Sequence, residues 1–100
     1  MQSEQYGDYL FHAYQSAAAN KDHELAFQLG SNYVAYAEAR LEQGDISEDT
    51  RILEAINQAT NFIWAQNLCY DGRGSMAEQS ARVGLGSKAR DLSFEAARIK

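Results

Sequence analysis

Few side chains in this sequence could carry out chemistry, and none of them stands in a recognised catalytic or metal-binding motif. His12 and His23 are eleven residues apart in different predicted helices, and Cys69 is the single cysteine of the chain. No two of them have the spacing of a C-x-x-C or H-x-x-x-H ligand pair. We therefore predict no catalytic residue, no metal site and no cofactor.

Two carboxylate pairs, Glu38 with Glu42 and Glu48 with Asp49, have the composition of general acid–base catalysts. Such catalysis needs apolar surroundings that raise the pKa of one carboxyl group, and the flanking residues predict none. We expect Glu38 and Glu42 on a solvated helix face. Glu48 and Asp49 would compensate the dipole of a following helix in its first turn. The chain is accordingly predicted not to be an enzyme.

Aromatic residues form a more informative set. Six tyrosines are more than a small core uses efficiently, because each buried hydroxyl needs a hydrogen-bond partner. Some of them should lie half exposed at a rim, as tyrosines often do in protein interfaces. The predicted partner-binding residues are Tyr6, Tyr9, Phe11, Glu38, Glu42 and Phe94.

Charge is unevenly distributed along the chain. The net charge is −5, but residues 1–71 hold eleven acidic and three basic residues, whereas residues 72–100 hold three acidic and six basic residues. The acidic part would repel nucleic acid and attract a basic protein surface. The basic part supports an alternative, a nucleic-acid-binding module that uses Arg73, Arg82, Lys88 and Arg90.

The elements that would position these residues are helices. The chain has no proline, and apolar residues recur at helical spacing through most of its length. We predict one all-α domain, residues 1–100, with three main helices in an up-down bundle and one or two short C-terminal helices. The predicted ranges are 4–19, 22–43, 48–70, 76–83 and 88–99. One bent helix through Gly84 is the alternative for the last two.

The helix 48–70 should be central, with Ser47 as its N-cap and Trp64 as its largest core side chain. The helix 22–43 has an apolar arc too wide for one neighbour, so it should contact elements on two sides. A short connection between these two helices predicts that they form a hairpin. Phe94 is expected off the buried face of the last helix.

These features favour a cytoplasmic, non-catalytic protein that docks on another protein, as an inhibitor or adaptor. Small phage-encoded inhibitors of nucleic-acid-handling complexes, including anti-CRISPR proteins and transcription inhibitors, share this size, charge and lack of motifs. No membrane partner is predicted, and the first hypothesis involves no direct contact with nucleic acid. A homodimer remains open. A third hypothesis is a ligand pocket between the helices 22–43 and 48–70, with Arg40 and Asn67 as its polar residues.

Overall fold

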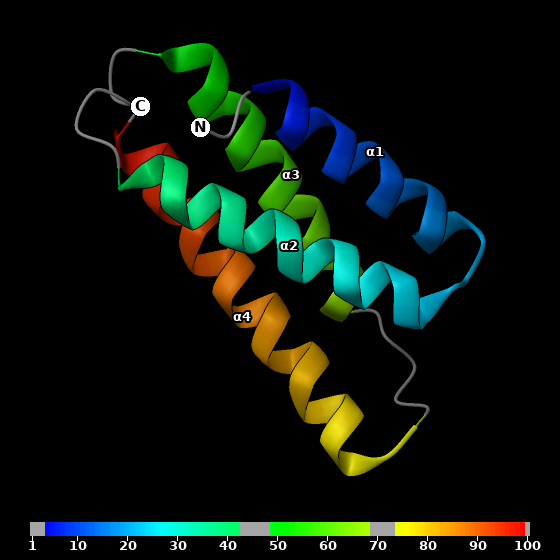
Figure 1. Ribbon diagram of the computed structural model, residues 1–100. Coiled ribbons are helices and arrows are strands. Elements are labelled where there is room, and N and C mark those ends of the chain that lie inside the picture. The colour runs from blue at the N-terminus through cyan, green and yellow to red at the C-terminus, as the bar shows by residue number, and fades with distance from the viewer. Residues whose placement is uncertain (1–3, 43–48, 69–73, 100) are drawn as a thin grey trace.

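The computed structural model describes residues 4–42, 49–68 and 74–99, and all regular secondary structure within them is helical (Figure 1). This confirms the predicted all-α class. Within the described residues, no helix combines the length and apolar character needed to span a membrane. The four helices are α1 (Glu4–Ala19), α2 (His23–Leu41), α3 (Thr50–Leu68) and α4 (Met76–Ile99).

Side-chain oxygens cap the starts of α2 and α4. The Asp22 carboxylate accepts a hydrogen bond from the backbone N–H of Leu25 at 3.3 Å. The Ser75 hydroxyl accepts one from the backbone N–H of Glu78 at 3.2 Å. Each bond satisfies a donor that the first turn of a helix leaves without a backbone partner. These polar residues therefore fix where the helices begin.

The start of α3 differs from the prediction. The Asp49 carboxylate accepts a hydrogen bond from the backbone N–H of Ile52 at 3.1 Å, so Asp49 caps a helix that begins at Thr50. An aspartate is as good an N-cap as the predicted serine. Ser47, together with the predicted end of the second helix at 43 and of the third at 70, lies outside the described residues.

The helices form two antiparallel hairpins, α1 with α2 and α3 with α4, packed on each other (Figure 1). The strongest contacts are those of α3 with α4 and of α1 with α2, whereas α2 and α3 contact each other only sparsely. The predicted hairpin of the second and third helices is therefore wrong. A short connection makes two helices antiparallel, but apolar surface decides which pairs pack closely. The prediction that the second helix has neighbours on two sides is confirmed, since α2 packs on α1 and on α4.

The largest fully buried side chains all belong to α3: Leu53, Ile56, Thr60 and Ile63. The Thr60 hydroxyl satisfies its own polarity by donating to the backbone carbonyl of Ile56 at 2.6 Å. Trp64, predicted as the main core residue, is only partly buried and packs at the edge of the core. Its indole lies beside α4, with Cδ1 4.0 Å from where a Cβ atom on Gly86 would stand and with the ring edge-on to Phe94 at a centroid distance of 5.9 Å.

Glycines allow the closest contacts between helices. A Cβ atom on Gly30 of α2 would lie 3.0 Å from the Tyr14 ring of α1 and 3.2 Å from Leu85 of α4. A Cβ atom on Gly7 would overlap the Tyr36 ring at about 2.5 Å. Both positions need the absence of a side chain, because neighbouring rings already fill that space.

Residues Met76–Ile99 form one continuous helix of 24 residues, so the two predicted short helices at 76–83 and 88–99 are wrong. The alternative, one helix that runs through Gly84, is confirmed, because the helix is unbroken at that residue. Gly86 is buried where α4 meets α3, and a Cβ atom there would lie 3.1 Å from the Cβ of Asn67. The glycine therefore serves close packing between α3 and α4, which offsets its low helix propensity.

Candidate protein-binding surfaces

A groove of about 340 Å³ runs along the outside of the α1–α2 hairpin. Small side chains of α1, including Ala13 and Ala17, line it, and Tyr9 and Leu25 stand at its rim. Tyr9 is 65% exposed and Leu25 is 43% exposed. The groove therefore combines a mostly apolar lining with two large exposed side chains. Its full lining is Tyr9, Ala13, Ser16, Ala17, Asn20, Asp22, Leu25 and Leu29.

The other aromatic candidates on α1 lie elsewhere. Tyr6 stands edge-on to Tyr36 of α2, with ring centroids 5.9 Å apart, and keeps part of its surface exposed. Phe11 is half-buried among the rings of Tyr33 and Phe62, at 6.0 and 5.6 Å. Phe11 thus joins α1 to α2 and α3, and Tyr9 is more exposed than Tyr6 or Phe11.

The two acidic candidates differ in their surroundings. Glu38 pairs with Lys88 of α4 across 3.4 Å, and both side chains are about half exposed. Glu42 is exposed directly after α2, where its backbone N–H caps the helix through the carbonyls of Glu38 and Arg40. An exposed ion pair of this kind stabilises a protein by well under about 1 kcal/mol. Glu38 therefore mainly contributes charge to the surface of the α1–α2 hairpin.

Phe94 belongs to the α3–α4 hairpin. It is 59% exposed, and its ring stands edge-on to Trp64 with centroids 5.9 Å apart. Met76 and Val83 of the same helix are 77% and 68% exposed. The sequence reasoning missed these two residues, because it divided α4 at Gly84. Spacings of seven and eleven residues, which place Met76, Val83 and Phe94 in line, carry meaning only along one unbroken helix.

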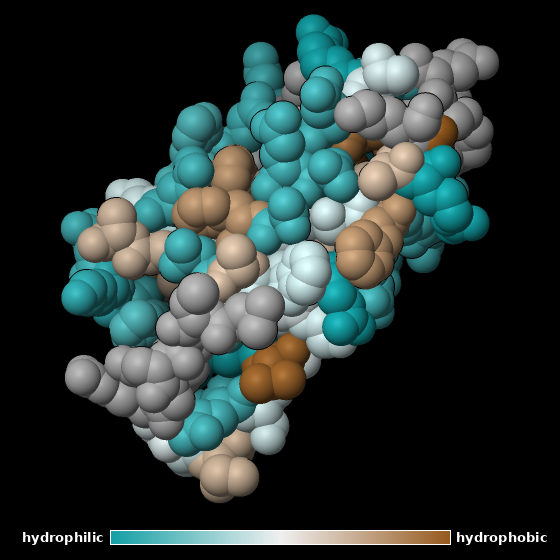
Figure 2. Space-filling model, turned by 180° about the vertical axis from the view of Figure 1, so that it is seen from behind, coloured by the Kyte–Doolittle hydropathy of each residue, from teal (hydrophilic) through white to brown (hydrophobic). Residues whose placement is uncertain are grey.

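On the face that Figure 2 shows, the exposed apolar groups do not merge into one broad patch. On the face turned away from the viewer of Figure 1, brown apolar groups stand apart among teal polar ones (Figure 2).

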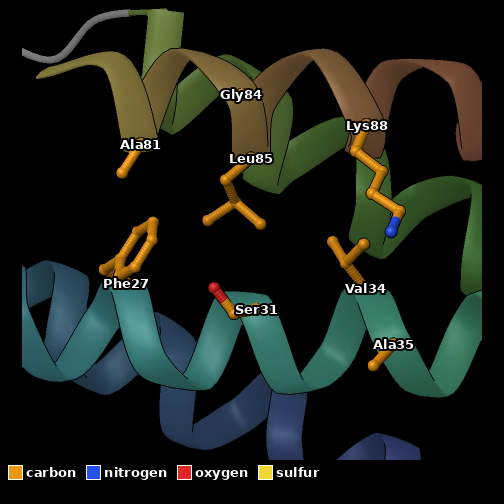
Figure 3. A pocket seen from close by; sticks show the side chains of 8 residues that line it. All are labelled: Phe27, Ser31, Val34, Ala35, Ala81, Gly84, Leu85 and Lys88. Atoms are coloured by element: carbon orange, nitrogen blue, oxygen red, sulfur yellow. The ribbon is translucent and has the colours of Figure 1, made fainter. Parts of the chain in front are cut away.

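A second groove, of about 240 Å³, lies between α2 and α4 (Figure 3). Phe27 and Val34 point from α2 toward α4, and Leu85 points from α4 toward α2. A Cβ atom on Gly84 would meet no other atom within 4 Å, so the glycine leaves open space at this groove. The complete lining is Phe27, Ser31, Val34, Ala35, Ala81, Gly84, Leu85 and Lys88.

The basic residues of the alternative hypothesis do not share one face. Arg82 is buried on the packed side of α4, with its guanidinium carbon 5.6 Å from the centre of the Phe27 ring. Lys88 and Arg90 are two residues apart, so they point to opposite flanks of the helix. Arg90 donates hydrogen bonds to Asp91 and to the Ser87 hydroxyl, at 3.3 and 3.4 Å. Arg73 lies outside the described residues.

The polar residues of the pocket hypothesis, Arg40 and Asn67, lie in the packed interior or at its edge. The Asn67 side chain donates to the Ile63 carbonyl at 2.8 Å and forms a hydrogen bond with Tyr14. The Arg40 Nε atom is buried and has no hydrogen-bond partner. Within residues 4–42, 49–68 and 74–99, no group of three or more His, Cys, Asp or Glu side chains could hold a metal ion.

Burial perturbs two tyrosines of the core. Burial raises the pKa of Tyr14 from 10.0 to about 12, and the hydrogen bond with Asn67 acts weakly in the opposite direction. Burial also raises the pKa of Tyr33, and the charges of Tyr36 and Asp8 add to that effect. Both hydroxyls therefore stay protonated at neutral pH and act as packed, neutral groups.

Comparison of the chain with protein-family models, curated proteins and solved structures finds no match. The geometry of the surfaces is therefore the basis for a functional proposal.

Proposed function

We propose that this chain is a non-catalytic protein-binding protein, an inhibitor or adaptor whose acidic α1–α2 hairpin docks on a basic surface of another protein. The observation that carries the proposal is the position of Tyr9. Its side chain is 65% exposed at the rim of the α1–α2 groove. Tyrosines placed this way are frequent anchors of protein interfaces.

Charge supports a basic partner. Residues 4–42 contain six acidic side chains and two basic ones, so the α1–α2 hairpin carries a charge of −4. A surface of this sign accelerates association with a positively charged surface and disfavours contact with nucleic acid. Proteins that handle nucleic acids have a basic channel or groove. The negative charge of the α1–α2 hairpin therefore best fits an inhibitor that binds such a channel.

Pull-down with matched variants tests the proposal. Immobilised chain should retain a protein from nuclease-treated lysate, and the double substitution Tyr9→Ser with Leu25→Ser should abolish that retention. Exchange of Gln58→Ser, an exposed polar residue on α3, is the matched control and should leave retention unchanged. Nuclease treatment ensures that nucleic acid does not bridge the two proteins. Equal retention by all three proteins, or by none, would overturn the proposal.

The alternative, a nucleic-acid-binding module, has weaker support from the geometry. Non-specific affinity for nucleic acid needs several cations on one side, and α4 buries Arg82 and separates Lys88 from Arg90. A mobility-shift assay at low salt distinguishes the two functions. A shift that Arg90→Ala weakens would favour the alternative over protein binding.

A further inference from the structure

The outer side of α4 carries an apolar stripe that no other helix of the described chain covers. Met76, Val83 and Phe94 are the stripe, and each is more than half exposed. They are seven and eleven residues apart, and the 18 residue steps from Met76 to Phe94 make five turns of an α-helix. The three side chains therefore project from the same side of α4 along most of its length.

This stripe is distinct from the packed side of α4. The buried residues of the helix recur every three or four positions, and they define the side that faces α2 and α3. Spacings of seven and of eleven residues both return to the same side of an α-helix, so the stripe forms one line that a second helix could follow. Phe94 at its C-terminal end is held edge-on by Trp64, so this end of the stripe has a fixed orientation. The packed side is formed by Arg82, Leu85, Gly86, Ala89, Leu92, Ser93 and Ala96.

We propose that the stripe is a homodimer interface, in which α4 of one copy packs antiparallel to α4 of a second copy. In an antiparallel pair, residues whose numbers have the same sum lie opposite each other. A sum of 170 places Met76 opposite Phe94 of the second copy, twice by symmetry, and Val83 opposite Ser87. Thioether–aromatic contacts are favourable, and the small residues at the centre allow the helix axes to approach closely.

Charge identifies a second copy as the occupant. Counted along their residues, α1 carries −2, α2 carries −1, α3 carries 0 and α4 carries +1. A chain with a net charge of −5 repels its own copies where α1 or α2 of two copies meet, and less along α3 and α4, which carry no acidic surplus. Of these two helices, only α4 exposes large apolar side chains among the described residues. Arg90, beside the stripe, is compensated by Asp91 at 3.3 Å and therefore adds little repulsion. The antiparallel direction also sets the two helix dipoles against each other favourably.

The size of the interface predicts its strength. One helix from each copy buries less than the ~800 Å² per partner of a standard stable interface. We therefore expect a dissociation constant on the order of 10–100 μM. The dimer would leave the α1–α2 groove open, because that groove lies on other helices. It would present two docking surfaces to a partner, whether or not the partner proposed above is the right one.

Sedimentation velocity across a concentration series tests the dimer. The average mass should rise from 11.2 kDa toward twice that value as concentration increases. Val83→Glu places two carboxylates at the centre of the interface and should weaken association at least tenfold. Ala77→Glu adds the same charge to the same helix away from the stripe and should have no such effect. A mass of 11.2 kDa up to 1 mM (roughly a hundred times the tighter limit of the expected constant), or equal association of both variants, would overturn the proposal.

Cysteine cross-linking tests the register independently. In a Cys69→Ser background, the Met76→Cys and Phe94→Cys variants are oxidised separately and as an equal mixture. Cross-links should form in the mixture alone, because like positions lie about 27 Å apart in the antiparallel pair. Cross-links within either separate variant would instead indicate a parallel pair and overturn the proposed arrangement. Absence of cross-links in the mixture at a concentration where sedimentation shows dimers would do the same.

Discussion

At the scale of single residues, Gly7 of α1 and Gly84 of α4 show that packing can require a glycine at one helical position and not at another. Each lies inside a continuous helix, where alanine has the better helix propensity by about 1 kcal/mol. A Cβ atom on Gly84 meets nothing within 4 Å, whereas one on Gly7 overlaps the buried Tyr36 ring. Helix propensity alone predicts the same effect of alanine at both positions, and only the surrounding packing distinguishes them.

We therefore expect the two alanine substitutions to change stability in opposite directions. Gly84→Ala should raise the free energy of unfolding by about 0.5–1 kcal/mol, since it gains helix propensity without a clash. Gly7→Ala should lower it by about 1–3 kcal/mol, because the Tyr36 ring is held among Tyr6 and Tyr33. Urea denaturation followed by circular dichroism measures both. A stabilised Gly7→Ala variant would show that the α1–α2 contact is looser than described.

Tyr14 makes the stability of the protein sensitive to alkaline pH. Its pKa is about 12 in the folded protein and 10.0 without burial, so the folded state holds the proton more tightly. Between pH 10 and 12 the unfolded chain releases this proton and the folded chain keeps it. The free energy of unfolding should therefore fall with rising pH, by about 1.4 kcal/mol per pH unit from this residue. The raised pKa of Tyr33 acts in the same direction.

Urea midpoints measured at pH 8, 10 and 11 check this expectation. Below pH 10 the tyrosine contribution should be constant, and above pH 10 the midpoint should fall. The Tyr14→Phe variant should show a shallower fall, although it starts less stable because it lacks the hydrogen bond with Asn67. Identical slopes for the two proteins would mean that Tyr14 is ionised as readily in the folded chain as in the unfolded one.

At the scale of helices, local signals in the sequence are sufficient for the start of α2 and insufficient for the extent of α4. Asp22 acts on donors three residues away, so its role depends on local sequence alone. Gly84 and Gly86 indicate a helix break by the same local criteria. Contact of Gly86 with Asn67, nineteen positions earlier in the chain, overrides them. Propensities of single residues contain no information about such a neighbour.

Asn57 is a second case in which tertiary contact changes the role of a residue. Its position on α3 predicts an exposed polar side chain, but its amide donates to the Ser93 carbonyl of α4 at 2.8 Å and to the Ser93 hydroxyl at 3.1 Å. Asn57→Ala should therefore lower the free energy of unfolding by about 1–2 kcal/mol, since it leaves a half-buried carbonyl without this donor.

Asn61 is the matched control for this prediction, one turn further along α3 and exposed. Asn61→Ala should change stability by no more than about 0.5 kcal/mol. Denaturation of both variants under the same conditions gives the comparison. Equal effects of the two substitutions would remove the inter-helix hydrogen bond from the account of how α3 and α4 are held together.

At the scale of the whole molecule, the sequence predicted the kinds of residue that form the candidate surfaces better than their arrangement. Exposure of Tyr9 and Phe94 agrees with the expectation of half-exposed aromatic residues, whereas Phe11 is enclosed by rings from two other helices. The sequence also could not predict that Arg82 is buried on the Phe27 ring, because a cation gives no sign in the sequence of the ring it packs on. The pairing of the two hairpins decides which residues form the candidate surfaces, and that pairing depends on contacts between residues distant in the sequence.

Separation of charge from apolar surface gives the two proposed interfaces opposite responses to salt. The α1–α2 hairpin carries a charge of −4, while α4 carries +1 and presents Met76, Val83 and Phe94. Added salt screens attraction between charged surfaces but leaves apolar burial intact. Raising sodium chloride from 50 to 300 mM should therefore weaken binding of a basic partner several-fold, mainly through a slower association rate. The fraction of dimer at a fixed concentration should stay constant or rise.

Titration calorimetry of the partner and sedimentation of the free chain, in the same two buffers, compare these responses. A dimer that dissociates with salt would place charge pairs, and not the apolar stripe of α4, at the contact between copies.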